Sequence, residues 1–333
     1  MAEIVLGIGV SHTPMLNAPV EDWPRFIERD QVRDNRDKDG APATYDDLLR
    51  AAGPDMAEHI KPEAMAVRHA AAMDNLQRIR DALANAALDA LIIVGDDQHE
   101  LHNDQNMPCF LIYRGETIPN VPLSAAGVDR ADSDWGVRMT AKYYETDGPR
   151  EYPVDAKLAN HLIERLIDDE FDIACANSVE PGKGEGHAFG FVHNRLLNDA
   201  DLPVTPVFVN TFYPPNQPSP RRCYTLGQAI SRAVASYPGD ARIGVIASGG
   251  LSHFTVDEDL DRGVLRALQE KDAAALQSIP THKLNGGSSE IRNWICAAGA
   301  LEALPLQWSD YQPGYRTPAG TGTGLGFAIW SNP

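Results

Sequence analysis

Residues 242–253, RIGVIASGGLSH, combine a short apolar run with a glycine pair and a histidine. Such a run, rich in β-branched side chains, predicts a buried strand over 242–248. The two glycines permit a tight turn, which ends the strand and places His253 just beyond it. The same order of strand, turn and histidine occurs in residues 3–12, EIVLGIGVSH, and in residues 89–99, DALIIVGDDQH.

Predicted strands alternate with predicted helices along the chain, which is typical of an α/β fold. Further strands are expected at 109–113, 171–176, 204–211 and 324–330, and helices at 62–87, 156–168, 221–236, 256–277 and 288–302. We therefore expect a single catalytic domain over 1–333, with a mostly parallel or mixed central sheet covered by helices. The charged, irregular residues 20–60 are expected to form an insertion, and they are a candidate for a lid.

Three predicted strands each deliver a histidine to one edge of this sheet, namely His12, His99 and His253. In open α/β sheets, ligands bind at the carboxyl ends of the strands. A lone histidine is more often structural than functional, but three at one edge favour a functional site. His102, close behind His99, is a further candidate.

A carboxylate for the same site is offered by the segment NGGSSEIRNWICAAGAL, where Glu290 falls in the first turn of a predicted helix. The helix dipole stabilises a carboxylate there, which by itself is a sufficient structural explanation. Two histidines and one carboxylate also form the ligand set of non-haem Fe(II) oxygenases, and the same set can hold catalytic zinc. The residues alone do not separate the two metals.

Composition narrows the function classes. Lys plus Arg is 29 and Asp plus Glu is 47, which gives a formal net charge of −18. Nucleic acid and anionic membranes both attract basic surfaces, so neither is an expected partner. The 4 cysteines form no CxxC pair, and we expect reduced thiols. The sequence shows no signal-peptide pattern and no run of about 20 apolar residues, so the expected location is the cytoplasm.

Several motifs in this order resemble a known family: GIGVSHTP, GHAFGFVHNRLL, ASGGLSHF and GGSSEIRNWICAAGAL. Together they are similar to the class III extradiol dioxygenases, in particular the β-subunit family of protocatechuate 4,5-dioxygenase, from residue 3 to about residue 330. The combination of SHTP, GGLSH and S-x-E-x-x-x-W is specific, whereas each motif alone is weak.

The resemblance implies roles for individual residues. His12 matches the first metal histidine of the family and Glu290 matches its metal glutamate. His253 matches an unligated histidine that acts as acid and base, and His187 matches a second active-site histidine near the substrate.

The chain departs from the family at the second metal histidine, where Asn-Asp-His or Pro-Asp-His is usual. Here the turn contains Asp97, Gln98 and His99. An ungapped match puts Gln98 at the ligand position, and a shift of one residue puts His99 there. Because imidazole is the better iron ligand, we expect His99 to bind the metal and Asp97 and Gln98 to support the ligands.

The resemblance implies a non-haem Fe(II)-dependent enzyme that opens the ring of a catechol-type substrate with O2. Two alternatives stay open: a zinc-dependent hydrolase on the same scaffold, and a non-catalytic binding protein derived from the fold. A carboxylated or a lignin-derived aromatic diol is the expected partner, and self-association as a homodimer is the default.

The predicted insertion carries several arginines that bear on the choice of substrate. They are Arg25, Arg29, Arg33 and Arg36. They either pair with a substrate carboxylate or balance nearby aspartates on a solvated face.

Overall fold

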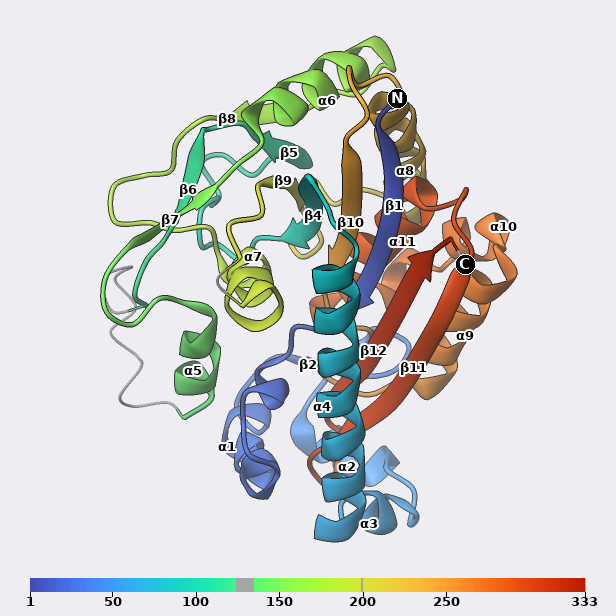
Figure 1. The fold of residues 1–333 in the computed structure, drawn as a ribbon. Helices are drawn as coiled ribbons and strands as arrows, with labels where there is room; N and C mark the ends of the chain where they lie inside the picture. The colour runs from blue at the N-terminus through green and yellow to red at the C-terminus, as the bar shows by residue number, and fades with distance from the viewer. Residues whose placement is uncertain (124–134, 199, 333) are drawn as a thin grey trace.

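The computed structural model describes residues 1–123, 135–198 and 200–332. Its centre is an eight-stranded sheet with the order β11-β12-β1-β10-β4-β9-β5-β8 (Figure 1). The strands are β1 (Glu3–Val10), β4 (Ala90–Asp96), β5 (Phe110–Tyr113), β8 (Ala174–Ala176), β9 (Val204–Val209), β10 (Arg242–Ser248), β11 (Leu306–Tyr315) and β12 (Gly322–Ser331). Two small hairpins lie outside it: β2 (Asn35–Arg36) with β3 (Pro42–Ala43), and β6 (Thr117–Asn120) with β7 (Arg150–Pro153).

The sheet is mixed. The four strands β1, β10, β4 and β9 run parallel, whereas β12 pairs antiparallel with β1, and β5 pairs antiparallel with β9. The prediction of an α/β fold with a mostly parallel or mixed central sheet is therefore confirmed.

Helices cover both faces of the sheet, and a separate apolar core lies on each face. The helices are α1 (Ile27–Asp30), α2 (Tyr45–Ala51), α3 (Met56–His59), α4 (Pro62–Asn85), α5 (Trp135–Thr140), α6 (Ala156–Asp168), α7 (His187–Phe191), α8 (Pro220–Ala235), α9 (Glu258–Glu270), α10 (Ala273–Gln277) and α11 (Ile291–Ala300). On β4, Ile92 and Val94 face the core built with α8 and α11, and Leu91 and Ile93 face the core built with α4. This alternation follows from the two-residue period of a strand.

Sequence patterns located most elements, with instructive exceptions. The expected helix over 256–277 is two helices, α9 and α10, because Lys271 between them adopts a left-handed conformation with φ of 54°. Strand β11 was not predicted. Its sequence, LQWSDYQPGY, is polar and contains a proline, and it pairs with β12 at the edge of the sheet, where a strand tolerates both features.

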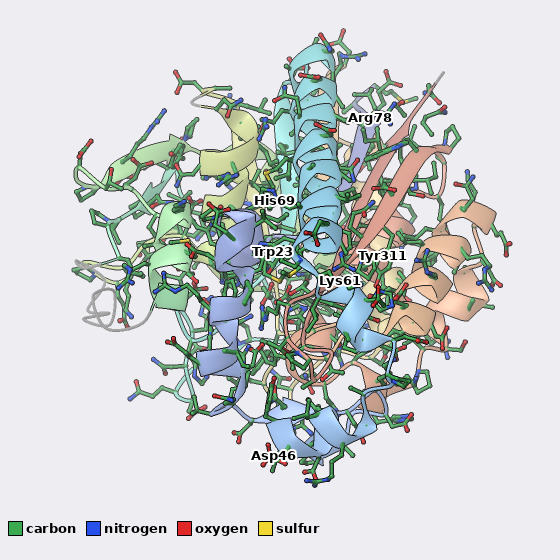
Figure 2. All side chains as sticks on the ribbon, turned by 90° about the horizontal axis from the view of Figure 1, so that it is seen from below. Trp23, Asp46, Lys61, His69, Arg78 and Tyr311 are labelled. Carbon is green, nitrogen blue, oxygen red and sulfur yellow. The ribbon has the colours of Figure 1, made fainter. Side chains whose placement is uncertain are left out.

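The predicted insertion at 20–60 forms short 3₁₀ and α-helical turns and the β2-β3 hairpin. Trp23 is fully buried and donates from Nε1 to the carbonyl of Met15 at 3.0 Å. Its ring meets that of His69 on α4 edge to face, with centroids 5.7 Å apart (Figure 2). The segment is thus anchored on the α4 side of the sheet, whereas Asp46 on α2 is exposed at the periphery.

Close packing around β1 depends on a missing side chain. Gly9 lies against the ring of Trp294 on α11, and a Cβ at Gly9 would approach Cζ3 of that ring to 2.3 Å. The indole is held in place by a hydrogen bond of 2.7 Å from its Nε1 to the carbonyl of Gly249. The glycine therefore allows α11, which carries Glu290 at its start, to sit directly on the sheet.

We predict that Gly9→Ala destabilises the fold by about 1–3 kcal/mol, because the added methyl overpacks a closed core. Urea unfolding followed by circular dichroism measures this change. Gly53→Ala is the matched control, since a Cβ at Gly53 meets nothing within 4 Å. Equal midpoints for the two variants would contradict this account of α11 packing.

Candidate metal centre and substrate pocket

Three neighbouring parallel strands bring the predicted site together. The carboxyl ends of β1, β10 and β4 are adjacent in the order β1-β10-β4. His12 follows β1, His253 follows β10, and the Asp-rich turn follows β4. Glu290 completes the group from the residue before α11, where a short 3₁₀ turn ends.

The hydrogen bonds of His12 fix which ring nitrogen is available. Nδ1 of His12 lies 3.0 Å from Oγ of Ser248, and that hydroxyl donates its proton to the carbonyl of Ala188 at 2.7 Å. A serine hydroxyl has one proton, so Oγ accepts from Nδ1–H of His12. Nε2 of His12 is left buried without a hydrogen bond, 3.0 Å from Oε2 of Glu290. An imidazole held in this way presents its Nε2 lone pair as a metal ligand.

Glu290 is the shared partner of the site. Its Oε2 accepts a hydrogen bond from the backbone N–H of Gly250 at 2.6 Å, and its Oε1 accepts from Nε2 of Gln98 at 3.2 Å and from Nε2 of His253 at 3.1 Å. Burial alone would raise the pKa of Glu290, but the charge of His253 and the hydrogen bond from it hold that pKa well below its usual range. The carboxylate is therefore ionised.

His253 donates from both ring nitrogens in this arrangement. Nδ1 lies 2.9 Å from the carbonyl of Leu251, and Nε2 faces the Glu290 carboxylate, so both partners only accept. Burial would lower the pKa of His253, but the charge of Glu290 and the hydrogen bond to it raise that pKa above its usual value. His253 thus carries an exchangeable proton at Nε2, directed at the centre of the site.

Asp96 is a second buried carboxylate here. Its carboxylate accepts from Nδ2 of Asn293 and from Nε2 of Gln98, both at 3.3 Å. Burial and the nearby charge of Glu290 raise the pKa of Asp96. Four residues each offer one ligand atom, and these atoms lie within 4.8 Å of one another: His12, Asp96, His187 and Glu290.

The structure does not bring His99, the predicted third ligand, into this group. Its backbone adopts φ of 62°, which turns the residue away from the strand direction. Its ring stacks on Tyr213 with centroids 3.7 Å apart, and its Nε2 lies 3.7 Å from Asp104. Gln98, the residue in ungapped register, is the one that contacts Glu290.

Asp97 and His102 also lie apart from the ligand atoms. The Asp97 carboxylate accepts from the backbone N–H groups of Leu101 and His102, at 2.8 and 3.1 Å, and so shapes the turn after β4. Burial and the charge of Glu100 raise the pKa of Asp97 to about 7. The ring of His102 packs edge-on against Phe208.

His187 is held by Glu100. Nδ1 of His187 lies 2.8 Å from Oε2 of Glu100, and its backbone N–H donates to Oε1 at 2.9 Å. The Tyr144 hydroxyl also donates to Oε1. The His187 ring meets that of His12 edge-on at 4.7 Å. Burial would lower the pKa of His187, but the charge of Glu100 and its hydrogen bond raise that pKa to about 10.

These residues fit a divalent cation. Two buried carboxylates, Asp96 and Glu290, lie beside a buried imidazole nitrogen of His12 that lacks a hydrogen bond. Buried like charges repel unless a cation or a proton neutralises them. Oxygen and imidazole donors suit first-row divalent metals, including Fe(II) and Zn(II).

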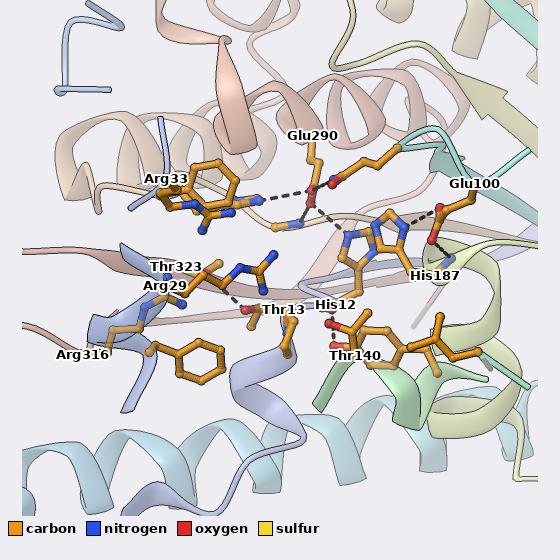
Figure 3. A pocket seen from close by; sticks show the side chains of 18 of the residues that line it. His12, Thr13, Arg29, Arg33, Glu100, Thr140, His187, Glu290, Arg316 and Thr323 are labelled. Carbon is orange, nitrogen blue, oxygen red and sulfur yellow. Dashed lines mark hydrogen bonds and ion pairs between the residues drawn. The ribbon is translucent and has the colours of Figure 1, made fainter. Parts of the chain in front are cut away.

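A cavity of about 400 Å³ opens in front of this group (Figure 3). His12 and His187 lie toward one side of the cavity, and Arg29, Arg33 and Arg316 lie toward the other. His253 and Glu290 also line the cavity. Small hydroxyls line the wall between the two sides. Oγ1 of Thr13 and Oγ1 of Thr323 are 3.2 Å apart.

Comparison with known proteins identifies the relationship. Residues 51–326 match the family model described as the catalytic LigB subunit of aromatic ring-opening dioxygenase. The chain belongs to this family. The resemblance noted in the sequence is thereby confirmed, and the matched span includes His187, His253 and Glu290 but begins after His12.

Two individual proteins that are similar to the chain are named as dioxygenases. The chain is 37% identical to gallate dioxygenase of Pseudomonas putida (strain KT2440) over 175 residues, which are 48% of this chain and 50% of that protein. It is 26% identical over 204 residues to 2,3-dihydroxyphenylpropionate/2,3-dihydroxicinnamic acid 1,2-dioxygenase of Paraburkholderia xenovorans (strain LB400), covering 45% of this chain and 63% of that protein. The chain thus spans between half and two thirds of the length of these two relatives.

Among the described residues, no helix is long and apolar enough to cross a membrane.

Three residues of the candidate site, Asp96, Glu100 and Ser248, were not predicted from the sequence. Asp96, the last residue of β4, was treated only as part of a turn, although a fully buried carboxylate at a strand end is a signal of function. Glu100 follows directly in the same turn, but its pairing with His187 spans 87 positions. Ser248 at the end of β10 orients His12 from 236 positions away. Contacts of this range are set by the tertiary fold.

We predict that Glu100→Gln lowers the pKa of His187 from about 10 toward its ordinary value of 6.5, because the charge of Glu100 is lost whereas burial and the charges of Asp96 and Glu290 remain. Titration of ¹⁵N-labelled histidine side chains by NMR in the metal-free protein measures the shift. An unchanged His187 titration would show that Glu100 does not control this proton.

The ion pair between Glu100 and His187 also makes the folding stability depend on pH. Burial raises the pKa of Glu100, but the charge of His187 and the hydrogen bonds that Glu100 accepts lower that pKa to about 2. The folding stability that Glu100 contributes is therefore fully present above about pH 4.5 and is lost as the pH falls toward 2. The contribution of His187 is present below about 6.5 and is lost as the pH rises toward 10. Between about pH 4.5 and 6.5 both contributions are complete, and Glu100→Gln should cost most stability there in urea unfolding.

Proposed function

We propose that this protein is a non-haem Fe(II)-dependent extradiol dioxygenase, which opens the ring of a catechol-type substrate with O2. The observation that carries the proposal is the free Nε2 of His12 beside the ionised Glu290, at the end of a cavity that also holds His253 and His187. Membership of the aromatic ring-opening dioxygenase family supports the same reaction.

In this proposal His12 and Glu290 hold the metal, and Asp96 supplies the third protein ligand. Asp96 already lies within 4.8 Å of the other ligand atoms, whereas His99 would have to leave its stack on Tyr213. Gln98 bridges Asp96 and Glu290 through its amide nitrogen and so fixes the spacing of the two carboxylates. When bound, Fe(II) supplies coordination of the substrate oxygens and the electronic coupling of substrate to O2.

The chain's own residues bind the substrate and move its protons. Nε2 of His253 lies 3.1 Å from Oε1 of Glu290, so it is placed to exchange a proton with a hydroxyl of a substrate bound beside that carboxylate. Glu100 holds the Nδ1 side of His187, which directs the opposite edge of that ring toward His12 and the cavity. His187 is thereby positioned to donate a hydrogen bond to substrate or product oxygen. His12 and His187 are buried and His253 is half-buried, which limits the access of water.

We predict that the protein, reconstituted anaerobically with Fe(II), consumes O2 with a catechol and forms a yellow ring-opened product. His12→Ala and Glu290→Ala should each lower Fe(II) content and abolish oxygen uptake, because a ligand is lost. Full activity of either variant would contradict the proposed centre. A preparation that binds Zn(II), hydrolyses ester or amide bonds and takes up no O2 would favour the zinc hydrolase, and a folded protein that binds no metal would favour a non-catalytic role.

We predict that His253→Ala retains Fe(II) but loses most of the turnover, by about 100-fold or more, which is the usual contribution of a general acid or base. Iron content by mass spectrometry and kcat by oxygen electrode separate the two effects. His161→Ala serves as the control, because His161 contacts Ala233 and Ser236 on the α8 side of the sheet, outside the cavity. Loss of iron in His253→Ala would assign His253 to the metal instead.

We predict that Asp96→Asn weakens Mn(II) or Fe(II) binding by at least tenfold, whereas His99→Ala changes it by less than twofold. Calorimetric titration of the metal-free proteins measures both affinities without any turnover. The reverse pattern would mean that the turn after β4 rearranges and that His99 binds the metal.

A further inference from the structure

We infer that Asp261 on α9 is a positioning residue for His253, which it reaches through the peptide group between Leu251 and Ser252. The inference rests on the proposed function, in which His253 exchanges a proton with the substrate. Asp261 lies in the first turn of α9, which packs against β11 and β12 (Figure 1). Its side chain is fully buried and does not line the cavity. It therefore acts on the site through its contacts with the turn after β10.

One peptide group joins Asp261 to the ring of His253. The N–H of Ser252 donates to Oδ1 of Asp261 at 2.7 Å. The carbonyl of Leu251 belongs to the same peptide group and accepts from Nδ1 of His253 at 2.9 Å. Because a peptide group is planar, fixing the direction of its N–H also fixes the direction of its C=O. Hydrogen bonds in such a chain also strengthen one another. Asp261 therefore sets the direction from which Leu251 holds the His253 ring.

The side chain of Ser252 provides a second link to α9. Its Oγ donates to Oδ2 of Asp261 at 2.7 Å and accepts from the backbone N–H of Asp257, also at 2.7 Å. On the other side, the carbonyl of Ser252 accepts from the backbone N–H of Gly324 on β12 at 2.8 Å. A Cβ at Gly324 would approach Oδ2 of Asp261 to 1.9 Å, so the glycine leaves the space that the carboxylate occupies. The residue before His253 is thus fixed between α9 and β12.

The ring of His253 fits closely between two glycines. A Cβ at Gly250 would approach Cε1 of the ring to 2.8 Å, and a Cβ at Gly287 would approach Cδ2 to 2.0 Å. The backbone N–H of His253 donates to Oγ of Ser288 at 3.0 Å. A small rotation of the turn would therefore press the ring against one backbone segment or move Nε2 from its position 3.1 Å from Oε1 of Glu290. The position of the reacting nitrogen depends on how the turn is held.

The carboxylate of Asp261 is costly to keep in this place. Burial raises its pKa to about 7, although the hydrogen bonds from Tyr311 and Ser252 lower it, and the charge of Asp257 raises it further. The Tyr311 hydroxyl donates to Oδ2 at 2.7 Å. Burying an ionised carboxylate disfavours folding, and an apolar side chain would avoid that cost. A role in holding the catalytic turn accounts for a carboxylate at this buried position.

The first test separates catalysis from binding. We expect Asp261→Ala to lower kcat for a catechol tenfold or more, because a small displacement of a proton-transferring group is costly. KM and the affinity for Mn(II), measured by calorimetry on the metal-free protein, should change by less than threefold. Asp261→Asn keeps an oxygen that can accept from the N–H of Ser252, so it should recover part of kcat. It also keeps the side-chain volume, and carries the test if Asp261→Ala does not fold.

Tyr311→Phe is the matched control, because it removes one hydrogen bond from the same carboxylate and leaves both bonds to Ser252 in place. It should lower kcat by less than threefold. A loss of kcat in Tyr311→Phe as large as in Asp261→Ala would overturn the inference, since the loss would then follow from packing in general. So would a loss of Mn(II) affinity in Asp261→Ala as large as its loss of kcat, because the effect would then extend to Glu290.

Hydrogen–deuterium exchange in the metal-free protein tests the same link without turnover. We expect Asp261→Ala to speed exchange in residues 249–255 by tenfold or more beyond any change in residues 242–248 of β10, because the N–H of Ser252 loses its acceptor. An equal change in both segments would overturn the inference. If no catechol supports oxygen uptake by the wild type, the proposed function fails, and the exchange result still decides whether Asp261 holds this turn.

Discussion

The site depends on the interactions of the buried Glu290 carboxylate with its neighbours. It receives hydrogen bonds from Gln98, His253 and the backbone of Gly250, and it lies 3.0 Å from Nε2 of His12. A buried charge of this kind is tolerated only when it is paired or bound to a metal. Because its partners follow three different strands, the carboxylate also links the ends of β1, β4 and β10. The order of the strands in the sheet therefore determines which side chains meet in the site.

Hydrophobic patterning was sufficient to predict the central part of the fold. The strands near 3–10, 89–95 and 242–248 and the helix from Pro62 lie within one or two residues of their predicted bounds, because apolar runs and helix-start signals are local properties. The edge strand β11 and the β6-β7 hairpin escaped prediction. They are short or polar, and long-range pairing in the folded chain stabilises them.

Four residues that sequence motifs predicted for the candidate site line the cavity: His12 and His253, which follow strands, and His187 and Glu290, which lie at helix starts. The turn after β4 was not predictable in the same way. The backbone of this turn has a positive φ at His99, which no local sequence pattern predicts. As a result, Asp96 and Gln98 lie near Glu290, and His99 does not. Proton-controlling pairs such as Glu100 with His187 depend on contacts between distant segments.

The central claim is that this centre joins O2 to a catechol, and labelled oxygen tests it most directly. The Fe(II)-loaded protein would be supplied with ¹⁸O2 and a catechol, and the ring-opened product examined by mass spectrometry, with a parallel reaction in H2¹⁸O to measure exchange of the product oxygens with water. The account predicts that the new oxygen atoms in the product come from ¹⁸O2, after correction for that exchange. A product whose new oxygen comes entirely from water, formed equally well without O2, would contradict it.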